Sequence, residues 1–272
     1  MPIIAVSRQL GSWGDLIASL VAERLNLVFV DRGMFVSLLQ ERGFSLAQAL
    51  SAETEEMPPD FWGQLSEHRR RAGILLGTML YELALENRLL VVGHGAEVLL
   101  RGVGHALRVK VAAPFEVRVA RVVAQEAVRR EAASELVRQS DQERFGYMKY
   151  LFHADWMESE LYDVCINTET MGVLSGVELI TSIAGAPEMA ATPESLAALA
   201  DRALANRVEL ALLLEPRVNS AGIQVGAEGG AVTLAGFARS DEQRAVAEGI
   251  ASALDGVETV RDELAVLSEI EG

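Results

Sequence analysis

A glycine-containing turn near the start of the chain has the residue types and spacing that hold a phosphate group. Residues 7–15 read Ser-Arg-Gln-Leu-Gly-Ser-Trp-Gly-Asp, between the apolar run Ile3–Val6 and a helical pattern at Leu16–Leu25. A strand, a glycine turn and a helix start, in this order, gather backbone N–H groups and the positive end of the helix dipole at one point. The stretch therefore predicts a cradle for an anion.

The same turn lacks two groups of the phosphate-binding motif GxxxxGK[ST], whose lysine contacts the phosphates and whose hydroxyl binds Mg²⁺. Here Gly14 is followed by Asp15 and Leu16, and the two lysines of the chain, Lys110 and Lys149, do not follow a glycine turn. The pattern favours the fold of a phosphoryl-transfer enzyme and leaves its chemistry open.

Composition narrows the class of protein. The chain has 272 residues, half of them hydrophobic, and a net charge of −15. This length predicts two domains at about 100–200 residues each, and the acidity argues against binding of nucleic acid. No leader-like segment opens the sequence and no apolar run reaches the ~18 residues of a membrane span. We therefore expect a cytoplasmic protein without integral membrane contact.

Strand-like and helix-like segments alternate over residues 1–185. Short runs rich in Val, Ile and Leu predict buried parallel strands: Ile3–Val6, Leu27–Val30, Leu89–Val92, Leu107–Ala112 and Asp163–Ile166. Helices are expected at Leu16–Leu25, at Phe61–Asn87 and from Pro114 on. The alternation predicts an α/β fold with a parallel sheet and helices on both faces. The single cysteine, Cys165, lies in the last apolar run, so we expect it in the core.

A second domain is predicted after a linker at residues 186–192, which contains small residues and prolines. The segments that follow have the order αββαβ, which predicts a small α+β domain over residues 193–268. They are a helix at Pro193–Leu214, strands at Gly222–Val225 and Ala231–Ala235, a helix at Asp241–Leu254 and a strand at Val257–Val266.

The first 185 residues resemble the cytidylate kinase-like family, a branch of the P-loop nucleoside monophosphate kinases. An ordered series of segments carries the resemblance: residues 4–8 with Gly11, Ser12 and Gly14, then 29–32, 91–96, 112–122, 140–144 with Tyr147 and Lys149, and 161–168. The resemblance implies a P-loop kinase-like sheet that binds ATP with Mg²⁺ and a nucleoside monophosphate such as CMP.

The resemblance also implies roles for individual residues. The donor phosphates would be surrounded by Ser7, Arg8, Gly11, Ser12, Gly14 and, at the position of the missing cation, Asp15. The transferring phosphates would be reached from the lid side by Arg118, Arg121 and Arg144, with Asp141 nearby; guanidinium groups suit phosphate because they bind it through two N–H groups. The acceptor would meet Asp31 and His94, the latter standing where the family usually has Arg.

Structural alternatives stand beside these roles. A carboxylate ~4 Å from a phosphate costs about 4 kcal/mol at an effective dielectric of ~20, so Asp15 either binds a metal or only favours the helix start. Arg8 is the candidate to replace the missing lysine. The helix pair Arg118 and Arg121 would otherwise form a solvated face.

Five further positions keep two interpretations each. Asp141 and Arg144 otherwise form a local ion pair of little energetic value, and Asp31 caps a helix. His94 has a structural role as its alternative. Trp13 either stacks on a base or covers the core.

Residues 193–268 look like a BON domain. The likeness rests on Gly-Ala-Val-Thr-Leu-Ala-Gly at residues 230–236, Gly-Val-Glu-Thr-Val at 256–260 and Glu-Leu-Ala-Val at 263–266. Such domains are regarded as lipid- or protein-interaction modules. Because no export signal is recognised, we expect a protein partner.

Two functions follow as expectations. The first is a kinase that transfers phosphate from ATP to CMP or a similar monophosphate at a low rate. The second is a catalytically impaired pseudokinase that senses nucleotide or acts as a scaffold, with the BON domain as its interaction module. The absent lysine, Leu16 and Asp15 favour the second.

Overall fold

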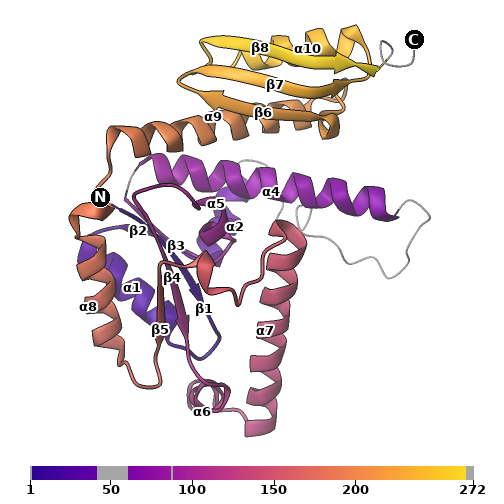
Figure 1. The fold of residues 1–272 in the computed structure, drawn as a ribbon. Helices are drawn as coiled ribbons and strands as arrows, with labels where there is room; N and C mark the ends of the chain where they lie inside the picture. Colours follow the sequence, from indigo (N-terminus) through magenta and orange to yellow (C-terminus); the bar gives the residue numbers. More distant parts are fainter. Residues whose placement is uncertain (1, 42–60, 87, 268–272) are drawn as a thin grey trace. The chain divides into compact units, whose positions relative to one another are not determined.

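The computed structural model describes residues 2–41, 61–86 and 88–267, and the chain divides into two compact units (Figure 1). The first unit combines Met1–Gly43 with Glu86–Thr192, and the second combines Phe44–Leu85 with Pro193–Gly272. A segment from the N-terminal half of the chain therefore belongs to the second unit.

The first unit is built on a parallel sheet with the strand order β2-β3-β1-β4-β5. Its strands are β1 (Ile3–Arg8), β2 (Val28–Val30), β3 (Leu89–Val92), β4 (Ala106–Ala112) and β5 (Val164–Asn167). Each lies within a few residues of a predicted strand. Because parallel strands all end at the same edge, the turns after β1, β2 and β3 lie at the carboxyl edge, where open α/β folds bind ligands.

Helices cover both faces of this sheet (Figure 1). On one face α1 (Gly14–Leu25) packs against α8 (Val173–Ala184), with Ile17 beside Gly176. On the other face the short helix α5 (Ala96–Leu99) lies against β1, and Trp156 reaches Ser7. Ser7 points away from the α1 face because side chains alternate along a strand and its neighbour Val6 belongs to the α1–α8 core.

The first unit has three further helices: one follows β2, one follows β4, and the third follows directly on the second. They are α2 (Arg32–Glu41), α6 (Phe115–Glu126) and α7 (Arg130–Phe152). α6 and α7 share a small apolar cluster that contains Val119 and Val137. One 3₁₀ turn, η1 (Ser159–Leu161), precedes β5, and another, η2 (Pro187–Met189), lies in the segment predicted as a linker.

The predicted place of Cys165 in the core is wrong, because this thiol is exposed. β5 is an edge strand, and of its residues only Ile166 is buried. The apolar run around Cys165 identified the strand, but such a run does not reveal whether a helix covers the second face.

The second unit contains the predicted αββαβ series. Its elements are α9 (Pro193–Leu214), η3 (Ser220–Gly222), β6 (Ile223–Glu228), β7 (Ala231–Ala238), α10 (Asp241–Ser252) and β8 (Thr259–Val266). β7 lies in the middle of the sheet, antiparallel to β6 and parallel to β8. Gly229 and Gly230 form the β6–β7 turn in left-handed conformations, which glycine adopts without a steric penalty.

Helix α4 (Phe61–Leu85) also belongs to the second unit, where it packs against α9. The Asn206 amide of α9 donates to the Ile74 carbonyl at 2.8 Å and to the Thr78 hydroxyl of α4. The sequence placed this helix within residues 1–185. Its apolar pattern predicts a packed helix but does not identify the partner; Asn87, the predicted last residue, lies outside the described residues.

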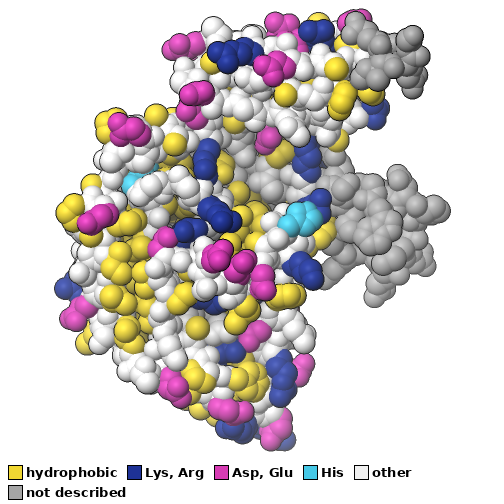
Figure 2. All heavy atoms as spheres, in the orientation of Figure 1, with side chains coloured by type: hydrophobic (Ala, Val, Ile, Leu, Met, Phe, Trp, Pro, Cys, Tyr) yellow, Lys and Arg dark blue, Asp and Glu magenta, His cyan; other side chains and the backbone are white. Residues whose placement is uncertain are grey.

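On the face of the molecule drawn in Figure 2, acidic and basic side chains are interspersed. The net charge of −15 is therefore not gathered into one acidic field on that face. Within the described ranges, no helix is long and apolar enough to cross a membrane.

Candidate functional site

The turn between β1 and α1 has the backbone conformation of an anion-binding nest. Gly11 and Trp13 have positive φ angles of 76° and 63°, on either side of Ser12. Such alternation turns successive N–H groups toward one concave side. Only glycine fits at position 11, because a Cβ there would lie 2.7 Å from the Arg118 carbonyl oxygen.

The carbonyl groups of this turn are held by donors from other elements. The Arg8 carbonyl accepts from Arg144 of α7. The carbonyls of the next residues accept in turn from three more side chains: Leu10 from Arg118 at 3.4 Å, Gly11 from Arg121 at 3.2 Å and Ser12 from Thr168 at 2.9 Å. The side of the turn that carries its carbonyl oxygens is thus fixed by three arginines and a threonine.

Several N–H groups of the same turn have no such partner. In the described part of the chain, no acceptor is in hydrogen-bonding geometry with the N–H groups of Leu10, Gly11, Trp13, Asp15 and Leu16. Unpaired donors at a helix start must be satisfied by water or a ligand. With four carbonyls bound by side chains and several N–H groups left without a partner in the described part of the chain, the turn has the polarity of a phosphate cradle.

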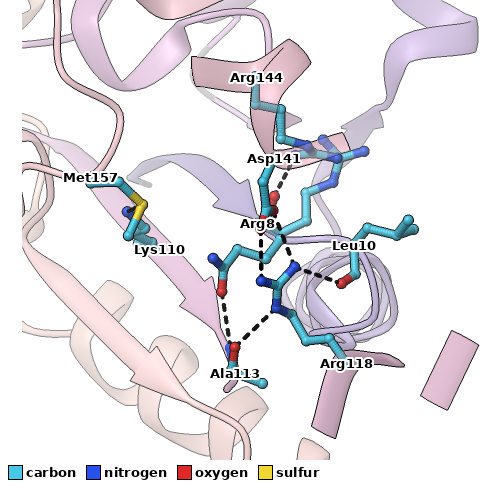
Figure 3. A network of polar contacts seen from close by, with 9 residues as sticks. Arg8, Leu10, Lys110, Ala113, Arg118, Asp141, Arg144 and Met157 are labelled. Atoms are coloured by element: carbon cyan, nitrogen blue, oxygen red, sulfur yellow. Dashed lines mark hydrogen bonds and ion pairs between the residues drawn. The ribbon is translucent and has the colours of Figure 1, made fainter. Parts of the chain in front are cut away.

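Arg118 supports this turn from a buried position. Its side chain is 4% exposed and forms a bidentate pair with Asp141, at 3.1 and 2.7 Å. Its Nε donates to the Ala113 carbonyl at 3.0 Å (Figure 3). The Gln9 side chain accepts from the Ala113 N–H at 3.2 Å. Arg118 and Asp141, both predicted for one site, are in contact, but all three guanidinium nitrogens are already hydrogen-bonded within the protein.

Arg121 holds the turn on the same side through Thr168. Its guanidinium donates to the Thr168 hydroxyl at 2.8 Å and to the Thr168 carbonyl at 2.7 Å. It also lies 3.6 Å from the centre of the Trp13 ring. The Trp13 indole therefore stacks on the guanidinium of Arg121, which also donates to the Gly11 carbonyl.

Arg8 and Asp15 form an ion pair beside the open amides. Arg8 Nε donates to Asp15 Oδ1 at 2.8 Å, with the arginine side chain 16% and the carboxylate 64% exposed. Gly14 permits this arrangement, because a Cβ at position 14 would overlap Cβ of Arg8. The acidic residue that the sequence places in the loop is thus neutralised by the nearest arginine.

Arg144 is the second cation of this region, and in Figure 3 its guanidinium lies beside that of Arg8. Burial, and then the charge of Arg8, lower the pKa of Arg144 to about 10, so the group stays charged at neutral pH. A local ion pair with Asp141 was the alternative that the sequence left open for Arg144. The carboxylate instead binds Arg118, and Arg144 reaches the backbone of Arg8.

The two predicted serines differ in their surroundings. Ser12 is buried in the turn, and its Oγ accepts from the Gly14 N–H at 3.3 Å. Ser7 lies at the end of β1, and its Oγ accepts from Trp156 Nε1 at 2.8 Å and from the Tyr162 hydroxyl at 3.4 Å. The Ser7 hydroxyl is therefore part of a buried cluster on the sheet face opposite α1.

The two predicted acceptor-side residues have structural partners. Asp31 Oδ1 accepts from the Met34 N–H at 2.9 Å, so it caps the start of α2, the alternative that the sequence left open. His94 stacks on Phe35 with ring centres 4.2 Å apart, and its φ is 60°. Burial, and then Arg8, lower the pKa of His94 to about 4, so the ring is neutral at pH 7.

Several residues near the loop were not identified from the sequence. Thr168 follows β5 and was noted only as part of a matching segment. Glu97 is buried on α5, and Lys110 is buried on β4, where its Nζ donates to the Trp156 carbonyl at 2.7 Å. The sequence signal for Lys110 is a charged residue within Leu107–Ala112, a run predicted to be buried, whereas Glu97 lies outside every predicted strand.

The residues at the loop do not fit a protein-held Mg²⁺. Leu16 occupies the position of the usual hydroxyl, the Asp15 carboxylate is bound to Arg8, and the Ser12 oxygen accepts from the backbone. Among the residues that the structure describes, no group of three or more His, Cys, Asp or Glu side chains is placed to hold a metal ion. The donor set thus favours a phosphate held by amides and arginines.

Comparisons with known proteins agree with this architecture. The model of the cytidylate kinase-like family matches residues 3–170, and that of the BON domain matches residues 200–268. No curated protein matches the chain. A solved structure of an uncharacterized protein from Eubacterium ventriosum has 19% identity and a TM-score of 0.53, and the match covers 68% of this chain and 98% of that one. This likeness supports the fold.

Two further solved structures are more distant. A sugar kinase from Janibacter has 17% identity and a TM-score of 0.43, over 71% of this chain and 99% of that one. A shikimate kinase from Bacteroides thetaiotaomicron has 15% identity and a TM-score of 0.38, over 67% and 97%. Likenesses at these TM-scores support no conclusion about substrate.

Proposed function

Because the chain belongs to the cytidylate kinase-like family, we propose that its first unit binds the phosphates of ATP in the turn between β1 and α1. We propose further that it transfers a phosphoryl group to CMP or a similar monophosphate at a low rate. The observation that carries the proposal is the polarity of the turn. Four of its carbonyls are bound by Arg144, Arg118, Arg121 and Thr168, while several of its N–H groups have no acceptor among the described residues.

The residues divide into two roles in this proposal. Arg8 and Arg144 contact the phosphates, since they are the cations beside the free amides. Arg118, Arg121 and Asp141 position the turn, because their polar groups are bound within the protein. Phosphoryl transfer requires mainly positioning and positive charge around the moving group, and a rigid cradle with two arginines supplies both.

The acceptor side of the proposed site is formed at the ends of β2 and β3. Asp31 and His94 follow these two strands, at the edge where the cradle lies. His94 is neutral at pH 7 and presents a buried Nε2 without a hydrogen-bond partner among the described residues. In the proposal this ring contacts the base or sugar of the acceptor, since it carries no charge for a phosphate.

The low rate follows from Asp15. A carboxylate ~4 Å from a bound phosphate costs about 4 kcal/mol at an effective dielectric of ~20, and half of that lowers a rate about thirtyfold. The ion pair with Arg8 reduces this cost but also takes a donor from the phosphates. ATP would bring its own Mg²⁺, which supplies charge neutralisation between the phosphates; the residues at the loop add no ligand set for it.

The Arg8–Asp15 pair also favours a second candidate function, a pseudokinase that binds nucleotide without turnover. Leu16 removes the hydroxyl and Asp15 engages the remaining loop cation. In this candidate the bound nucleotide is a signal, and the BON domain of the second unit passes it to a partner.

A coupled assay with CMP, dCMP and UMP, together with calorimetric titration of ATP, separates these functions. We expect ATP binding and slow turnover with a cytidine monophosphate. Binding without turnover for any monophosphate supports the pseudokinase, and absence of ATP binding at millimolar concentration refutes both.

Asp15→Asn should raise ATP affinity about tenfold, which corresponds to about 1.4 kcal/mol. Glu143→Gln, which removes an exposed carboxylate next to Arg144 in the chain, is the matched control.

We also propose that the second unit binds a protein partner and that the chain acts in the cytoplasm. The BON domain match supports an interaction module, and the net charge of −15 disfavours contact with anionic lipid or nucleic acid. Phe237 of β7 is 50% exposed and is the residue to test. Phe237→Ser should abolish co-purification of the partner with the full chain and leave ATP affinity unchanged.

A further inference from the structure

Glu97 is a buried acid for which neither the fold nor the proposed roles above give a reason. Its side chain is 2% exposed on α5, and one carboxylate oxygen, Oε2, has no hydrogen-bond partner among the described residues. An ionised carboxylate in such a place is costly unless it is paired, and each unpaired buried polar atom needs an explanation. Burial raises the pKa of Glu97, because the ionised form loses its hydration, so this acid binds a proton more readily than an exposed glutamate does.

Glu97 is connected to the phosphate turn through Ser7. The carboxyl group accepts a hydrogen bond from the Ser7 hydroxyl, whose oxygen in turn accepts from Trp156 at 2.8 Å and from Tyr162 at 3.4 Å. Ser7 directly precedes Arg8, and the Arg8 carbonyl is the one bound by Arg144. A change in the charge of Glu97 therefore acts on Ser7, and Ser7 is the direct neighbour of Arg8 at the start of the cradle.

The charges around Glu97 come from three elements. Arg144 of α7 and Lys110 of β4 both favour its ionised form. The tyrosines near it, Tyr147 of α7 and Tyr162 before β5, have pKa values raised by burial and by Glu97, so they remain neutral. Arg144 is thus the cation that Glu97 shares with the proposed phosphate site.

We propose that Glu97 is a positioning residue that takes up a proton when a phosphate occupies the cradle. With the cradle empty, the carboxylate balances the buried charge of Arg144. A bound phosphate supplies that negative charge itself, so a proton from solvent adds to Glu97 Oε2, and the carboxylate becomes a carboxylic acid. The other oxygen keeps the Ser7 hydrogen bond, and the turn is held without an excess of negative charge.

The proposal rests on phosphate binding at the cradle and predicts a linkage between binding and pH. Uptake of one proton makes the Kd rise with pH, by up to about tenfold per pH unit inside the window between the pKa values of Glu97 in the free and bound states. Glu97→Gln retains the shape and the hydrogen bond from Ser7 but cannot take up a proton. The affinity of Glu97→Gln for ATP should therefore vary with pH only because ATP itself titrates.

The test is calorimetric titration of ATP into the full chain, in buffers of low and high ionisation enthalpy. The titration is repeated from pH 5.5 to 9 in steps of about 0.5 pH unit, which are fine enough to follow the titration of one group. We expect the wild type to take up more protons than Glu97→Gln, by up to about one per ATP. The control variant Glu143→Gln should behave like the wild type. Equal uptake in wild type and Glu97→Gln, or none in the wild type, overturns the proposal. Absence of ATP binding overturns the proposed function as well, so the two failures are distinguishable.

A second measurement examines Glu97 without any ligand. An acid whose pKa is raised by folding binds its proton more tightly in the native state, so the free energy of unfolding falls as the pH rises above the unfolded value of about 4.5. Wild type should therefore lose stability relative to Glu97→Gln as the pH rises from that value. Ser7→Ala removes a hydrogen bond that favours the ionised form, so the loss should start at the same pH and extend to higher pH. Parallel curves for wild type and Glu97→Gln overturn the proposal.

Discussion

The turn after β1 and the turn after β3 end neighbouring strands of one sheet, and both contain glycines in left-handed conformations. They differ in where their polar groups are bound. The first turn has its carbonyls fixed by side chains from α6, α7 and the end of β5, and it leads into a helix of twelve residues with free amides. The second leads into the four-residue α5. There the Glu97 carboxyl group accepts a hydrogen bond from the backbone N–H of Glu97 itself.

The difference explains why we propose only the first of the two glycine turns as a binding site. In the second turn Gly93 donates to the Val6 carbonyl at 3.0 Å, and Gly95 lies against the Phe152 ring, where a Cβ would overlap it. That turn is closed by its own sheet and by α7. In the turn after β1, arginines from α6 and α7 donate hydrogen bonds to the carbonyl oxygens. Several N–H groups of this turn are therefore available to a ligand. The glycines are necessary in both turns, but the surrounding donors decide the function.

Removal of Arg118 should break this comparison most strongly. Arg118→Ala leaves Asp141 without its buried partner and frees the Leu10 carbonyl, so we expect a loss of about 3–5 kcal/mol of stability. Urea unfolding measures it. Arg138→Ala, which breaks an exposed pair with Glu135, should cause almost no change. Equal losses in the two variants would show that Arg118 is not a structural support of the turn.

The second turn should be the pH-sensitive one. Burial lowers the pKa of His94 from 6.5 to about 4. The unfolded chain then binds the proton more tightly, so stability is full above pH 6.5 and falls as the pH drops toward 4, by about 2–3 kcal/mol. His94→Asn tolerates the left-handed backbone and lacks the titrating ring. Its unfolding free energy should lose that part of the pH dependence, and an unchanged pH profile would contradict the assignment.

Alanine at a glycine of each turn should separate stability from binding. Gly14→Ala and Gly95→Ala each introduce an overlap, with Arg8 and with Phe152, and each should cost about 1–3 kcal/mol. Only Gly14→Ala should also weaken ATP binding, by at least about tenfold, because it displaces Arg8 beside the cradle. Calorimetry on folded samples measures the affinity. A similar loss of affinity in Gly95→Ala would mean that the second turn also contacts ATP.

The smallest effect is expected at Thr168, which holds the Ser12 carbonyl. Thr168→Val keeps the shape and removes the hydroxyl that donates to Ser12 and accepts from Arg121, so we expect a loss of about 1 kcal/mol. Thr168→Ser retains the hydroxyl and should lose less. Thermal unfolding of the pair, with ATP affinity measured in parallel, tests whether the donors on the carbonyl side support the cradle. If the serine variant loses more than the valine variant, the hydroxyl is not the supporting group.

The sequence by itself determined the strands of both units, their order and several of the helices. Apolar runs and glycine turns act over a few residues, so β1, the turn at Gly11 and Gly14, α1 and the αββαβ series were identified within a few residues of their bounds. The fold class followed from the alternation of strands and helices. The resemblance to the family predicted Arg8, Arg118, Arg121, Asp141 and Arg144 as one group, and their role in binding stays a prediction.

Only the tertiary structure decided which partner each charged group takes. Asp141 binds Arg118 across 23 positions and not its helix neighbour Arg144, and Glu97 reaches Ser7 from a different element. It also assigned α4 to the second unit and exposed Cys165 at a sheet edge. Apolar patterning fixes which face of an element is buried, whereas ion pairs and helix partners depend on distances between segments far apart in the chain, which no local pattern encodes.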